Sequence, residues 1–474
     1  MQTASGPSLD CPQSKPVDQP HGAFVSLTTR YRSRVQRVYS TAPCNRHSQR
    51  QGKTHSCLSR VSAGVSGKPP TPESRATPTP PHQAPRGCRS AAVSGRLRRG
   101  FSTVASRPPW ALIHPGPCLV RSAAPRASFW LAEPPGVSLL LVPGHLVDHR
   151  PFPDADSDII PILAGVATST SGDGLLLVRF FDGRATAPIV DTHGVTLGGR
   201  KVIGIDLDPD IMHFICNPLS GQLLRLPDID GTKKTADCRN FGLLTRSTHG
   251  HGPPDRYAVA ELSEDRGVEK RSFVMRRLLS QTGEWEKLVG LPSPLPLARP
   301  LDIHYEVSAF AGRLWWVDLS WGVVSADPFS DRPELRFVEL PSASVLPASS
   351  TNAERLAARA RNVYRRMGVS QGRLRYVELS EKKPFLLSSF VLDDDSSCWT
   401  LEHQVALGRL WAHGGHPSEE DIPRIGALDP LNASIMLITI GTHVLAVEMD
   451  RGEVLGCSLV GEGELRPSDL DAEF

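Results

Sequence analysis

The chain has 474 residues, of which 39% are hydrophobic and 22% are charged, and its formal net charge is only +3. A balance this close to neutral excludes a protein that binds nucleic acid as a whole-molecule polycation. The nine cysteines are an odd set without any Cys-x-x-Cys pair, which excludes a secreted disulfide framework and the common zinc sites.

The charge divides the chain into two parts. Residues 1–107 carry 17 Lys and Arg against 3 Asp and Glu, a balance of +14, whereas the remaining residues carry 36 against 47, a balance of −11. The first part contains no Ile and no Trp and is rich in Ser, Thr, Pro and Arg. It cannot bury enough apolar surface to offset the entropy of ordering, so we expect residues 1–107 to be a disordered basic extension.

The same extension has the arginine- and serine-rich, acid-poor composition of an organelle transit peptide. Residues 96–103 (RLRRGFST) and 37–40 (RVYS) are similar to the end of a mitochondrial presequence, where Arg, a spacer and an aromatic residue precede cleavage before Ser. We therefore expect a mitochondrial location. The alternatives are a plain tail in the cytoplasm or nucleus, translated leader sequence, and a plastid transit peptide. Aromatic residues are sparse in the extension, so nucleic-acid binding is not favoured.

Beyond residue 107 the pattern changes to short apolar runs separated by Gly, Pro, Asp and Asn, which is typical of strands joined by tight turns. The predicted strands are residues 128–132, 138–142, 175–181, 213–216, 223–226, 257–262, 272–279, 313–319, 335–340, 374–379, 387–392, 399–405, 434–440, 444–448 and 454–459. So many strands exceed what one sandwich holds. The sequence therefore predicts a mainly β protein, with a propeller-like ring of small antiparallel sheets over residues 108–460 and five to seven blades. Residues 461–474 are expected to be an acidic flexible tail.

The longest apolar run, residues 433–449, is interrupted by Gly441, Thr442 and His443. It falls short of the roughly 18 uninterrupted residues that a membrane span needs. We interpret it as two strands joined by a turn, and we expect a soluble protein without a membrane partner.

One segment departs from the strand pattern. Residues 351–367 have helical periodicity, and Thr351 and Glu354 have the spacing of a capping box. We expect this short helical insertion to end near Gly368. The predicted apolar stripe and charged face consist of Leu356, Ala360, Val363 and Tyr364, and of Arg359, Arg361, Arg365 and Arg366. The expected role is an insertion with a solvated arginine face, and the alternative is a docking helix.

A tryptophan-rich stretch carries a family resemblance. It runs GRLWWVDLSWGVVSADP over residues 312–328 and LRFVELP over 335–341, and residues 369–377 (VSQGRLRYV), 399–402 (WTLE) and 107–113 (RPPWALI) fit with it. Over about residues 107–460 the chain resembles a plant family, expanded in grasses, that is catalogued as domain of unknown function 1618. The resemblance implies a plant protein, and it transfers no catalytic residue because the family has no established chemistry.

A second resemblance is to the propeller-like domains that follow F-boxes in plant ubiquitin-ligase receptors. Residues 214–227 (FICNPLSGQLLRLP) are similar to their strand-turn-strand unit, and residues 281–285 (QTGEW) are similar to the turn and tryptophan of another blade. This resemblance implies partner binding through the propeller. No Leu-Pro-rich helical F-box is seen ahead of the domain, so a ligase-adaptor role is not expected.

The common motifs of cofactor binding and metal-dependent catalysis do not occur in the sequence. The chain has no Gly-x-Gly-x-x-Gly loop, Walker lysine or His-Glu-x-x-His helix, and no catalytic or cofactor-binding residue is predicted. The metal-ligating candidates are the His249/His251 pair and the His413/His416 pair with Glu419 and Glu420. All lie in Gly- and Pro-rich stretches, so we expect solvated loop histidines and no metal. Residues 393–395 (DDD) lack the ligand spacing of a calcium loop and are expected to be a charged turn.

The tryptophans are the remaining candidates for a binding surface. Trp315, Trp316 and Trp321 would form an aromatic patch if they faced solvent. Neighbours on a strand point to opposite faces, so at least one of Trp315 and Trp316 is expected in the core. We also expect Trp285 and Trp399 to be largely buried.

These observations favour a non-catalytic protein-interaction module with an unidentified protein partner. The alternatives are an enzyme whose active site lies in the central channel of the propeller, and an organelle RNA-associated factor.

Overall fold

The computed structural model describes residues 23–26 and 110–459, apart from residues 155, 172, 189–195, 198–199, 207, 234–239, 249–253, 266–270, 296–298, 304–306, 349–350, 394–396 and 411–421. The chain divides into two units, residues 1–32 with 108–474 and residues 33–107. All described residues belong to the first unit. The predicted extension and the predicted tail over 461–474 lie outside the described residues, except that four residues of the extension form strand β1 (Ala23–Ser26).

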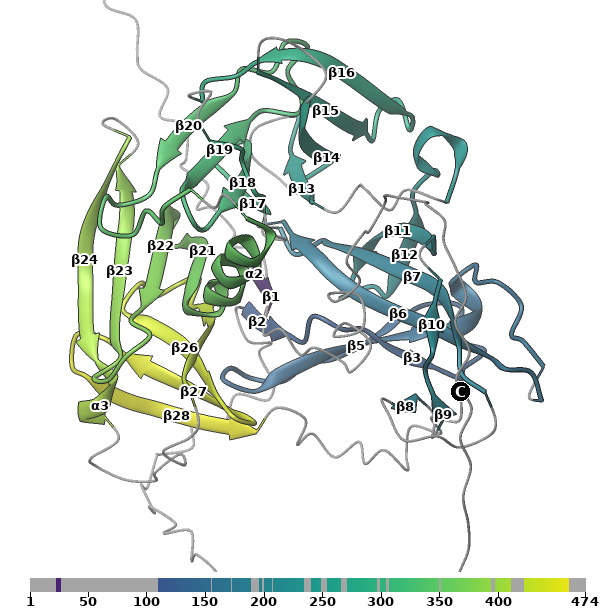
Figure 1. The fold of residues 1–474 in the computed structure, drawn as a ribbon, viewed down its shortest axis with the longest axis horizontal. Coiled ribbons are helices and arrows are strands. Elements are labelled where there is room, and N and C mark those ends of the chain that lie inside the picture. The colour runs from purple at the N-terminus through teal and green to yellow at the C-terminus, as the bar shows by residue number, and fades with distance from the viewer. Residues whose placement is uncertain are drawn as a thin grey trace, which may run out of the picture. The chain divides into compact units, whose positions relative to one another are not determined.

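The strands assemble into six larger sheets, which we number I to VI in chain order (Figure 1). Sheet I consists of β1, β2 (Trp110–Ile113), β3 (Cys118–Val120), β4 (Ser128–Trp130) and β5 (Val137–Pro143). Sheet II consists of β6 (Ile159–Thr170), β7 (Leu176–Thr186), β10 (Gly204–Ile205), β11 (Asp210–Asn217) and β12 (Gln222–Arg225). A separate two-stranded sheet pairs β8 (Thr196–Leu197) with β9 (Arg200–Lys201).

The other four sheets each have four strands in consecutive order. Sheet III consists of β13 (Phe241–Arg246), β14 (Arg256–Asp265), β15 (Ser272–Leu279) and β16 (Trp285–Pro292). Sheet IV consists of β17 (Val307–Phe310), β18 (Arg313–Asp318), β19 (Gly322–Ala326) and β20 (Arg336–Glu339). Sheet V consists of β21 (Arg365–Ser370), β22 (Arg373–Leu379), β23 (Leu386–Asp393) and β24 (Cys398–Ala406). Sheet VI consists of β25 (Arg424–Leu428), β26 (Ile435–Ile440), β27 (His443–Glu448) and β28 (Glu453–Leu459).

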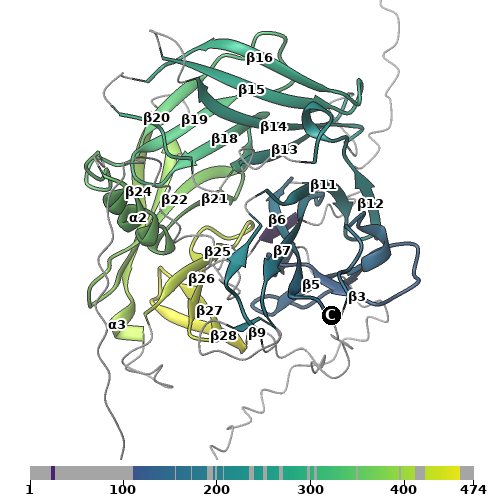
Figure 2. The same cartoon turned by 45° about the vertical axis from the view of Figure 1, so that its right-hand side comes forward.

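Sheets II to VI are antiparallel and form a five-blade propeller arrangement, which confirms the predicted fold class (Figure 2). Their inner strands β6, β13, β17, β21 and β25 follow one another around the axis, each beside the next along this series. Sheet I closes the ring, because β1 lies beside both β25 and β6.

Sheet I differs from the predicted pattern of purely antiparallel sheets. Strands β2 and β3 both pair with β5 in the parallel direction, and β1 pairs with β2 in the same way. Parallel neighbours need a long connection, and the chain between β2 and β5 supplies one that contains β3 and β4.

Six hydrophobic clusters hold the ring together, one at each boundary between neighbouring sheets. Alternate residues of one strand enter different clusters, since successive side chains point to opposite faces. On β7, Leu176, Val178 and Phe180 pack toward sheet I, whereas Leu177 packs toward sheet III. Both faces of these strands are therefore buried, which explains why their sequences are nearly continuous apolar runs.

Two tryptophans tie neighbouring blades through hydrogen bonds. The Trp285 indole N–H, on the outer strand of sheet III, donates to the Pro227 carbonyl of sheet II at 2.8 Å. The Trp399 indole, on the outer strand of sheet V, donates to the Glu339 carbonyl of sheet IV at 2.8 Å. Both rings are half-buried rather than largely buried as predicted, because their strands form the rim of the propeller.

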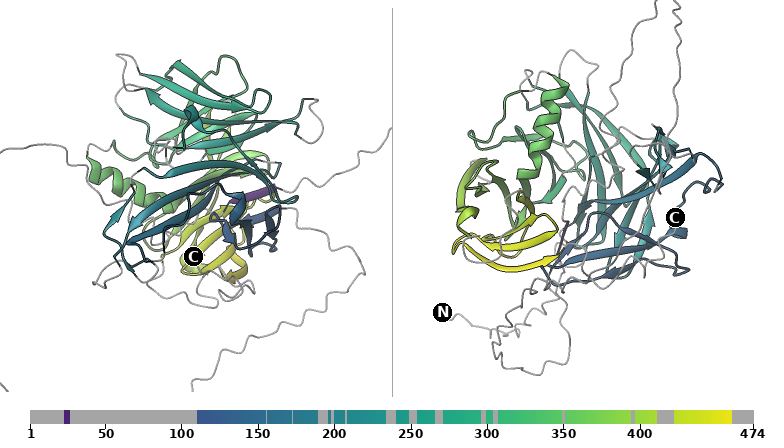
Figure 3. Two further views of the ribbon diagram at one scale, coloured as in Figure 1. Left: turned by 90° about the vertical axis from the view of Figure 1, so that its right-hand side faces the viewer. Right: turned by 60° about the horizontal axis from the view of Figure 1, so that its bottom comes forward.

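The helical insertion is shorter than predicted. Helix α2 (Asn352–Arg361) continues as the 3-10 helix η3 (Asn362–Tyr364). Helix α2 lies outside the sheets (Figure 3). The capping box is confirmed, since the Thr351 N–H donates to Glu354 Oε2 at 3.1 Å and the Glu354 N–H donates to Thr351 Oγ1 at 3.2 Å. Ala360, predicted on the apolar stripe, is exposed.

The predicted helix end near Gly368 is wrong, because residues 365–370 form the inner strand β21, where Arg365 pairs with Glu378. Two arginines assigned to the helix face instead cross blade boundaries. Arg365 Nη1 donates to the carbonyl of Leu319, between β18 and β19, at 2.8 Å and to that of Ser344, after β20, at 2.7 Å. The buried Arg366 Nη1 donates to the Gly426 carbonyl of sheet VI. Sheet pairing and these long-range acceptors override the local helical pattern.

The outer strands have edges that are poor templates for another strand. Strands β12 and β20 are only four residues long. Strands β16, β24 and β28 each contain a register shift relative to the strand they pair with. The shifts lie opposite Phe273/Met275 of β15, Ser389/Phe390 of β23 and Ala446/Val447 of β27, respectively. Short or bulged edges discourage pairing with another chain.

The remaining short elements are the helix α3 (Leu407–Leu410) and the 3-10 helices η1 (Gly144–Leu146) and η2 (Ile229–Gly231).

Candidate functional site

Among the residues that the structure describes, a connected group of charged side chains lies at one end of sheet II. Strand β6 covers one edge of β7 from Thr170↔Leu176 to Ile159↔Thr186. On the other edge, β11 pairs only as far as Asp210↔Asp182, and β10 takes over with Gly204↔Thr186. The pairing along this edge of β7 is therefore interrupted between β10 and β11. The chain that crosses this break contains Asp206 and Asp208.

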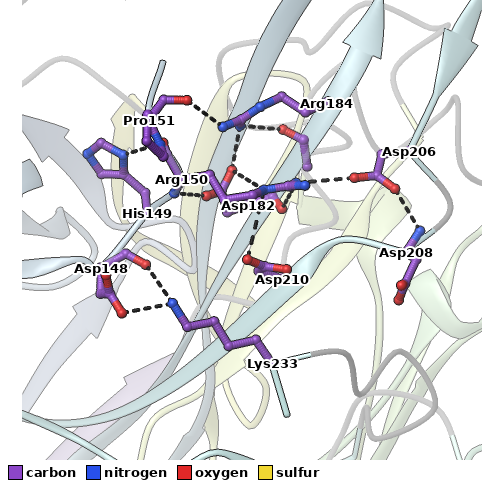
Figure 4. A network of polar contacts seen from close by, with 11 residues as sticks. Asp148, His149, Arg150, Pro151, Asp182, Arg184, Asp206, Asp208, Asp210 and Lys233 are labelled. Carbon is purple, nitrogen blue, oxygen red and sulfur yellow. Dashed lines mark hydrogen bonds and ion pairs between the residues drawn. The ribbon is translucent and has the colours of Figure 1, made fainter. Parts of the chain in front are cut away.

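Arg150 fills this break (Figure 4). Its backbone N–H donates to Asp182 Oδ2 at 2.5 Å and its Nη2 donates to the Asp182 carbonyl at 2.5 Å. The same guanidinium lies 3.2 Å from Asp206 Oδ2 and 3.8 Å from Asp210 Oδ2. The Asp182 side chain is only 1% exposed, so Arg150 neutralises a carboxylate that would otherwise be costly to bury.

Arg184 holds the same carboxylate from the other side. Its Nη1 donates to Asp182 Oδ1 at 2.7 Å, and its Nη2 donates to the Pro151 carbonyl at 2.8 Å. The second contact anchors the chain that precedes Phe152. The ring of His149 lies 4.7 Å from the Phe152 ring, and His149 Nδ1 is 2.9 Å from the Arg150 carbonyl oxygen. The segment over residues 148–152 is thus fixed against β7 by several polar contacts.

A second group of ion pairs lies beside the first. Lys233 Nζ donates to Asp148 Oδ2 at 2.8 Å, and this hydrogen bond with the charge of Lys233 lowers the pKa of the Asp148 carboxyl from its usual range. Arg225 Nη1 lies 3.9 Å from the same carboxylate and pairs with Asp228 at 2.7 Å. These pairs join β12 and the chain after η2 to the segment that carries Arg150.

The surface of this end is acidic. Two Asp-x-Asp-x-Asp segments flank the end of β7, one before β6 and one leading into β11: Asp154, Asp156 and Asp158, and Asp206, Asp208 and Asp210. With Asp182 these make seven carboxylates, against the two guanidinium groups of Arg150 and Arg184. Four of the seven are exposed, namely Asp154, Asp156, Asp158 and Asp208.

This spacing resembles that of calcium-binding loops, but Arg150 occupies the centre of the second segment. A cation between these carboxylates would meet the guanidinium charge. Over the described residues, no group of three or more His, Cys, Asp and Glu side chains has the geometry of a metal site.

Large apolar side chains project from the same end. Phe152 is 44% exposed, Ile159 is 44% exposed and Ile203 is 62% exposed. Ile159 lies opposite Thr186 of β7. Thr186 and Arg184 are two positions apart on β7, so Ile159 and Arg184 lie on the same face of the sheet. The Ile203 N–H donates to the Thr186 carbonyl at 2.9 Å from the other edge of β7.

We call this surface the acidic end of sheet II. It consists of Arg150, Phe152, Asp154, Asp156, Asp158, Ile159, Asp182, Arg184, Ile203, Asp206, Asp208 and Asp210.

Behind the acidic end, His213 of β11 is a buried titratable group, 5% exposed. Its ring packs edge-to-face on Phe241 of sheet III, with centroids 4.9 Å apart, and it lies opposite Arg179 in the sheet. Burial, with a smaller contribution from the Arg179 charge, lowers the pKa of His213 from 6.5 to about 3. This histidine is therefore neutral at physiological pH and serves the packing of the boundary between sheets II and III.

The predicted tryptophan candidates lie in the core. Trp315 is 6% exposed, Trp316 is fully buried and Trp321 is 4% exposed. Trp316 packs in the cluster between sheets III and IV and Trp315 in the cluster between sheets IV and V, which confirms that they point to opposite faces. They form no aromatic ligand surface.

The other sequence candidates do not join the acidic end. Asp393 is the last residue of β23, and its two neighbours Asp394 and Asp395 lie outside the described residues. The histidine pairs His249/His251 and His413/His416, with Glu419 and Glu420, also lie outside them.

The acidic end was not predicted from the sequence. A signal was present, since two Asp-x-Asp-x-Asp segments occur within 60 residues of each other at 154–158 and 206–210. What the sequence does not show is that Arg150 lies between Asp182 and Asp206, because those residues are 32 and 56 positions away.

Among the described residues, no helix is both long and apolar enough to span a lipid bilayer.

Comparison with known proteins gives one family match. The model of the family described as "Protein of unknown function (DUF1618)" matches residues 316–438, from β18 into β26. This confirms, over that segment, the resemblance predicted from the tryptophan-rich stretch. No curated protein matches the chain.

Solved structures give distant matches. A chain of the "Crystal Structure of Mitotic Checkpoint Complex" is 9% identical, with 66% of this chain and 70% of that chain covered and a TM-score of 0.27. A putative 6-phosphogluconolactonase from Bacteroides fragilis is 11% identical, with 72% of this chain and 94% of that chain covered and a TM-score of 0.25. Neither TM-score reaches 0.5, so these matches contribute nothing to the functional argument.

Proposed function

We propose that this protein is a non-catalytic protein-binding module and that its partner docks on the acidic end of sheet II. The observation that carries the proposal is the exposure of Phe152, Ile159 and Ile203 around a rigid network of ion pairs. Apolar side chains that stay exposed beside ordered polar groups are the usual composition of a protein interface.

The rim of the propeller is a less suitable docking place. Its outer strands are short or bulged, so they do not offer a straight row of backbone donors and acceptors to an added strand. The proposed partner therefore binds through side chains at the end of a blade and not by extending a sheet.

The enzyme alternative required a reactive group near the propeller axis. Ser169 of β6 is a hydroxyl near the inner strands, and it is used by the backbone: Leu243 N–H donates to Ser169 Oγ at 3.2 Å, and Ser169 Oγ donates to the Val307 carbonyl at 3.4 Å. These contacts give Ser169 a structural role, joining sheets II, III and IV.

The proposal is tested by placing a photo-crosslinking amino acid at Ile203 or, as a matched control, at Val289. Both side chains are exposed to a similar extent, 62% and 65%, but Val289 lies on the rim of sheet III. In cells, the probe at position 203 should give a discrete adduct with a defined protein, and the probe at 289 should not. Adducts of equal yield at both positions, or none at 203, would contradict the proposal.

We further propose that the basic extension directs the protein to mitochondria, on the strength of its composition and the RLRRGFST run at residues 96–103. Fluorescent fusions carrying residues 1–107, or a shortened form that starts at residue 96, should accumulate in mitochondria. Diffuse fluorescence from both fusions would contradict this.

A further inference from the structure

We propose that the inner edge of strand β2 is a strand-binding site. Strand β1 occupies this site in the intact chain. Once the chain is cut between β1 and β2, the site accepts an extended, mainly apolar segment of a partner protein. This site is separate from the acidic end of sheet II and does not depend on the docking proposed there.

Strand β1 is held by few contacts along the chain. It pairs with β2 in the parallel direction from Ala23↔Trp110 to Ser26↔Ile113, and it is the last strand on this side of sheet I. It lies beside β6 and β25, at the axis of the ring (Figure 1). Parallel pairing is slightly less stable per residue than antiparallel pairing. The connection over residues 27–109 is long, which raises the entropic cost of bringing the two strands together. A four-residue strand under these conditions can be displaced.

The edge of β2 that β1 covers is costly to leave empty. The other edge of β2 pairs with β5 only at Leu112 and Ile113, so among the described strands Trp110 and Ala111 pair with β1 alone. All four side chains of β2 are buried. Backbone donors and acceptors that lose their partner in buried surroundings cost free energy. Another extended segment satisfies them in a row, as in peptide recognition by strand addition.

The surroundings of β2 select the chemistry of that segment. Trp110 and Leu112 pack in the cluster with sheet VI, whereas Ala111 and Ile113 pack in the cluster with sheet II. A strand on the inner edge of β2 lies between the same two sheets, where an unpaired charge would be costly to bury. The segment AFVS of residues 23–26 is uncharged and mainly apolar, and the partner segment should share this composition.

The chain between β1 and β2 contains both predicted presequence cleavage positions, before Ser40 and before Ser102. Hydrolysis of either peptide bond by a processing peptidase, with water as the second reactant, leaves β1 on a separate fragment. The pairing of β1 with β2 then becomes intermolecular and loses the effective concentration that the connection provides. This opening step rests on the mitochondrial location proposed above, whereas the strand-binding site itself does not.

The experiment uses the full chain with the recognition sequence of a site-specific protease inserted after Phe101, so that the folded protein can be nicked in solution. The probe is a fluorescent peptide of residues 19–30 (QPHGAFVSLTTR). Its matched control carries N-methyl groups on Phe24 and Val25, which remove two neighbouring backbone donors and leave the side chains unchanged. Successive residues of a strand direct their backbone groups to opposite edges, so one of these two donors faces β2.

A second variant opens the site without a cut. F24P/V25P in the uncut chain removes the same donors from β1. Its matched control is A91P/A92P, which makes two proline substitutions elsewhere in the extension. Thermal melting checks that each protein is folded. If F24P/V25P does not fold, the nicked chain decides the test.

Fluorescence anisotropy should show that the nicked chain and F24P/V25P bind the probe on the order of tenfold or more tightly than the uncut parent and A91P/A92P. The reason is that an intact, tethered β1 competes with the probe at high effective concentration. The N-methylated probe should bind the nicked chain roughly tenfold more weakly, because it lacks a backbone hydrogen bond to β2.

Three results would overturn the inference: no binding of the probe to the folded nicked chain, equal binding by the nicked and uncut chains, or equal binding of the two probes. If the nicked chain binds the probe while the fluorescent fusions stay diffuse, the strand-binding site stands and the mitochondrial proposal alone is wrong. The crosslink from position 203 reports on the acidic end and is independent of both.

Discussion

The boundary between sheets III and IV and the boundary between sheets VI and I each join neighbouring sheets of the ring, but they differ in the size of the hydrophobic cluster and in the polar contacts. In the described part of the chain, the III–IV cluster contains 14 buried side chains and the VI–I cluster contains seven. The III–IV boundary also has polar ties: the Trp316 indole donates to the Asn240 carbonyl at 3.1 Å, and Arg246 pairs with Asp327 at 3.0 Å. At the VI–I boundary, Ser458 Oγ donates to the Pro135 carbonyl at 2.7 Å.

The difference shows where the ring is strongest. Sheets III and IV are neighbours in the chain, whereas sheets VI and I come from opposite ends of it. Closure of the ring therefore depends on the packing of two sheets that no short connection holds together. We infer that the VI–I boundary opens more easily than the III–IV boundary, and the following experiments test this difference.

The largest effect on stability is expected from replacing the buried tryptophan at each of these two boundaries. Trp316 is fully buried at the III–IV boundary, and Trp110 is 7% exposed at the VI–I boundary. Trp316→Ala should lower the free energy of unfolding by about 3–5 kcal/mol, because it leaves a cavity in the larger cluster. Trp110→Ala should cost less, at the lower end of this range or about 3 kcal/mol, because the smaller cluster can relax around it. Denaturant unfolding measures both, and a larger loss for Trp110→Ala would reverse the ranking of the boundaries.

The next effect is a loss of stability in acid at the boundary between sheets II and III. The pKa of His213 is lowered from 6.5 to about 3, so the unfolded chain binds a proton that the folded chain does not. The stability from this difference is complete above pH 6.5 and is lost as the pH falls toward 3. At pH 5 the loss should be about 2 kcal/mol, at roughly 1.4 kcal/mol per pKa unit.

The measurement is unfolding free energy against pH for the parent protein, for His213→Leu and for a control, His443→Leu, which changes an exposed histidine on β27. The first substitution should flatten the profile between pH 4 and 7, and the control should leave its slope unchanged. An unaltered slope in His213→Leu would show that other groups cause the acid dependence.

A smaller effect is expected from the tryptophans on the rim. Trp285→Phe and Trp399→Phe keep an aromatic ring but remove the hydrogen bonds to the carbonyls of Pro227 and Glu339. Each should lower the unfolding free energy by about 1 kcal/mol, the net value of one hydrogen bond. Thermal melting should show nearly equal shifts for the two variants. A shift as large as that of Trp316→Ala would mean that the rim tryptophans contribute as much as a core residue.

The smallest effect on stability is expected at the boundary between sheets VI and I, where the ring closes. Ser458→Ala removes the hydrogen bond to Pro135 and should cost under about 1 kcal/mol. Native-state hydrogen exchange should nevertheless detect it, with faster exchange of the amides in β28 and unchanged exchange in β18 and β19. Uniform acceleration in all three strands would indicate that the ring unfolds as one cooperative unit.

Features set by neighbouring residues could be predicted from the sequence. The turn between β11 and β12 follows the expected chemistry: Asn217 Oδ1 accepts the N–H groups of Leu219 and Ser220 at 3.1 and 3.2 Å. At the same turn Gly221 has φ +69°, and a Cβ atom there would lie 2.0 Å from the Ala127 carbonyl oxygen. The hairpin of β26 and β27 was likewise predicted from the interruption at residues 441–443.

Features set by distant residues could not be predicted. Arg365 and Arg366 have the spacing of helix residues, and only the structure shows their acceptors, which lie 21 to 60 positions away. The acidic end was missed for the same reason, because its central arginine and its buried Asp182 come from separate strands and loops. The mixed pairing of sheet I depends on which strands meet around the ring, and local periodicity carries no information about that.

Successive side chains of β7 enter two different hydrophobic clusters, and this affects which positions of such a sequence can change in evolution. In a strand with one solvated face, every second position is free to change, so homologous sequences differ mainly at alternate positions. Here Leu177 is enclosed as completely as Leu176 and Val178, at 0% exposure for all three. Tolerance to substitution along such a strand should be uniformly low, and the lasting variation among relatives should collect in the turns and on the rim.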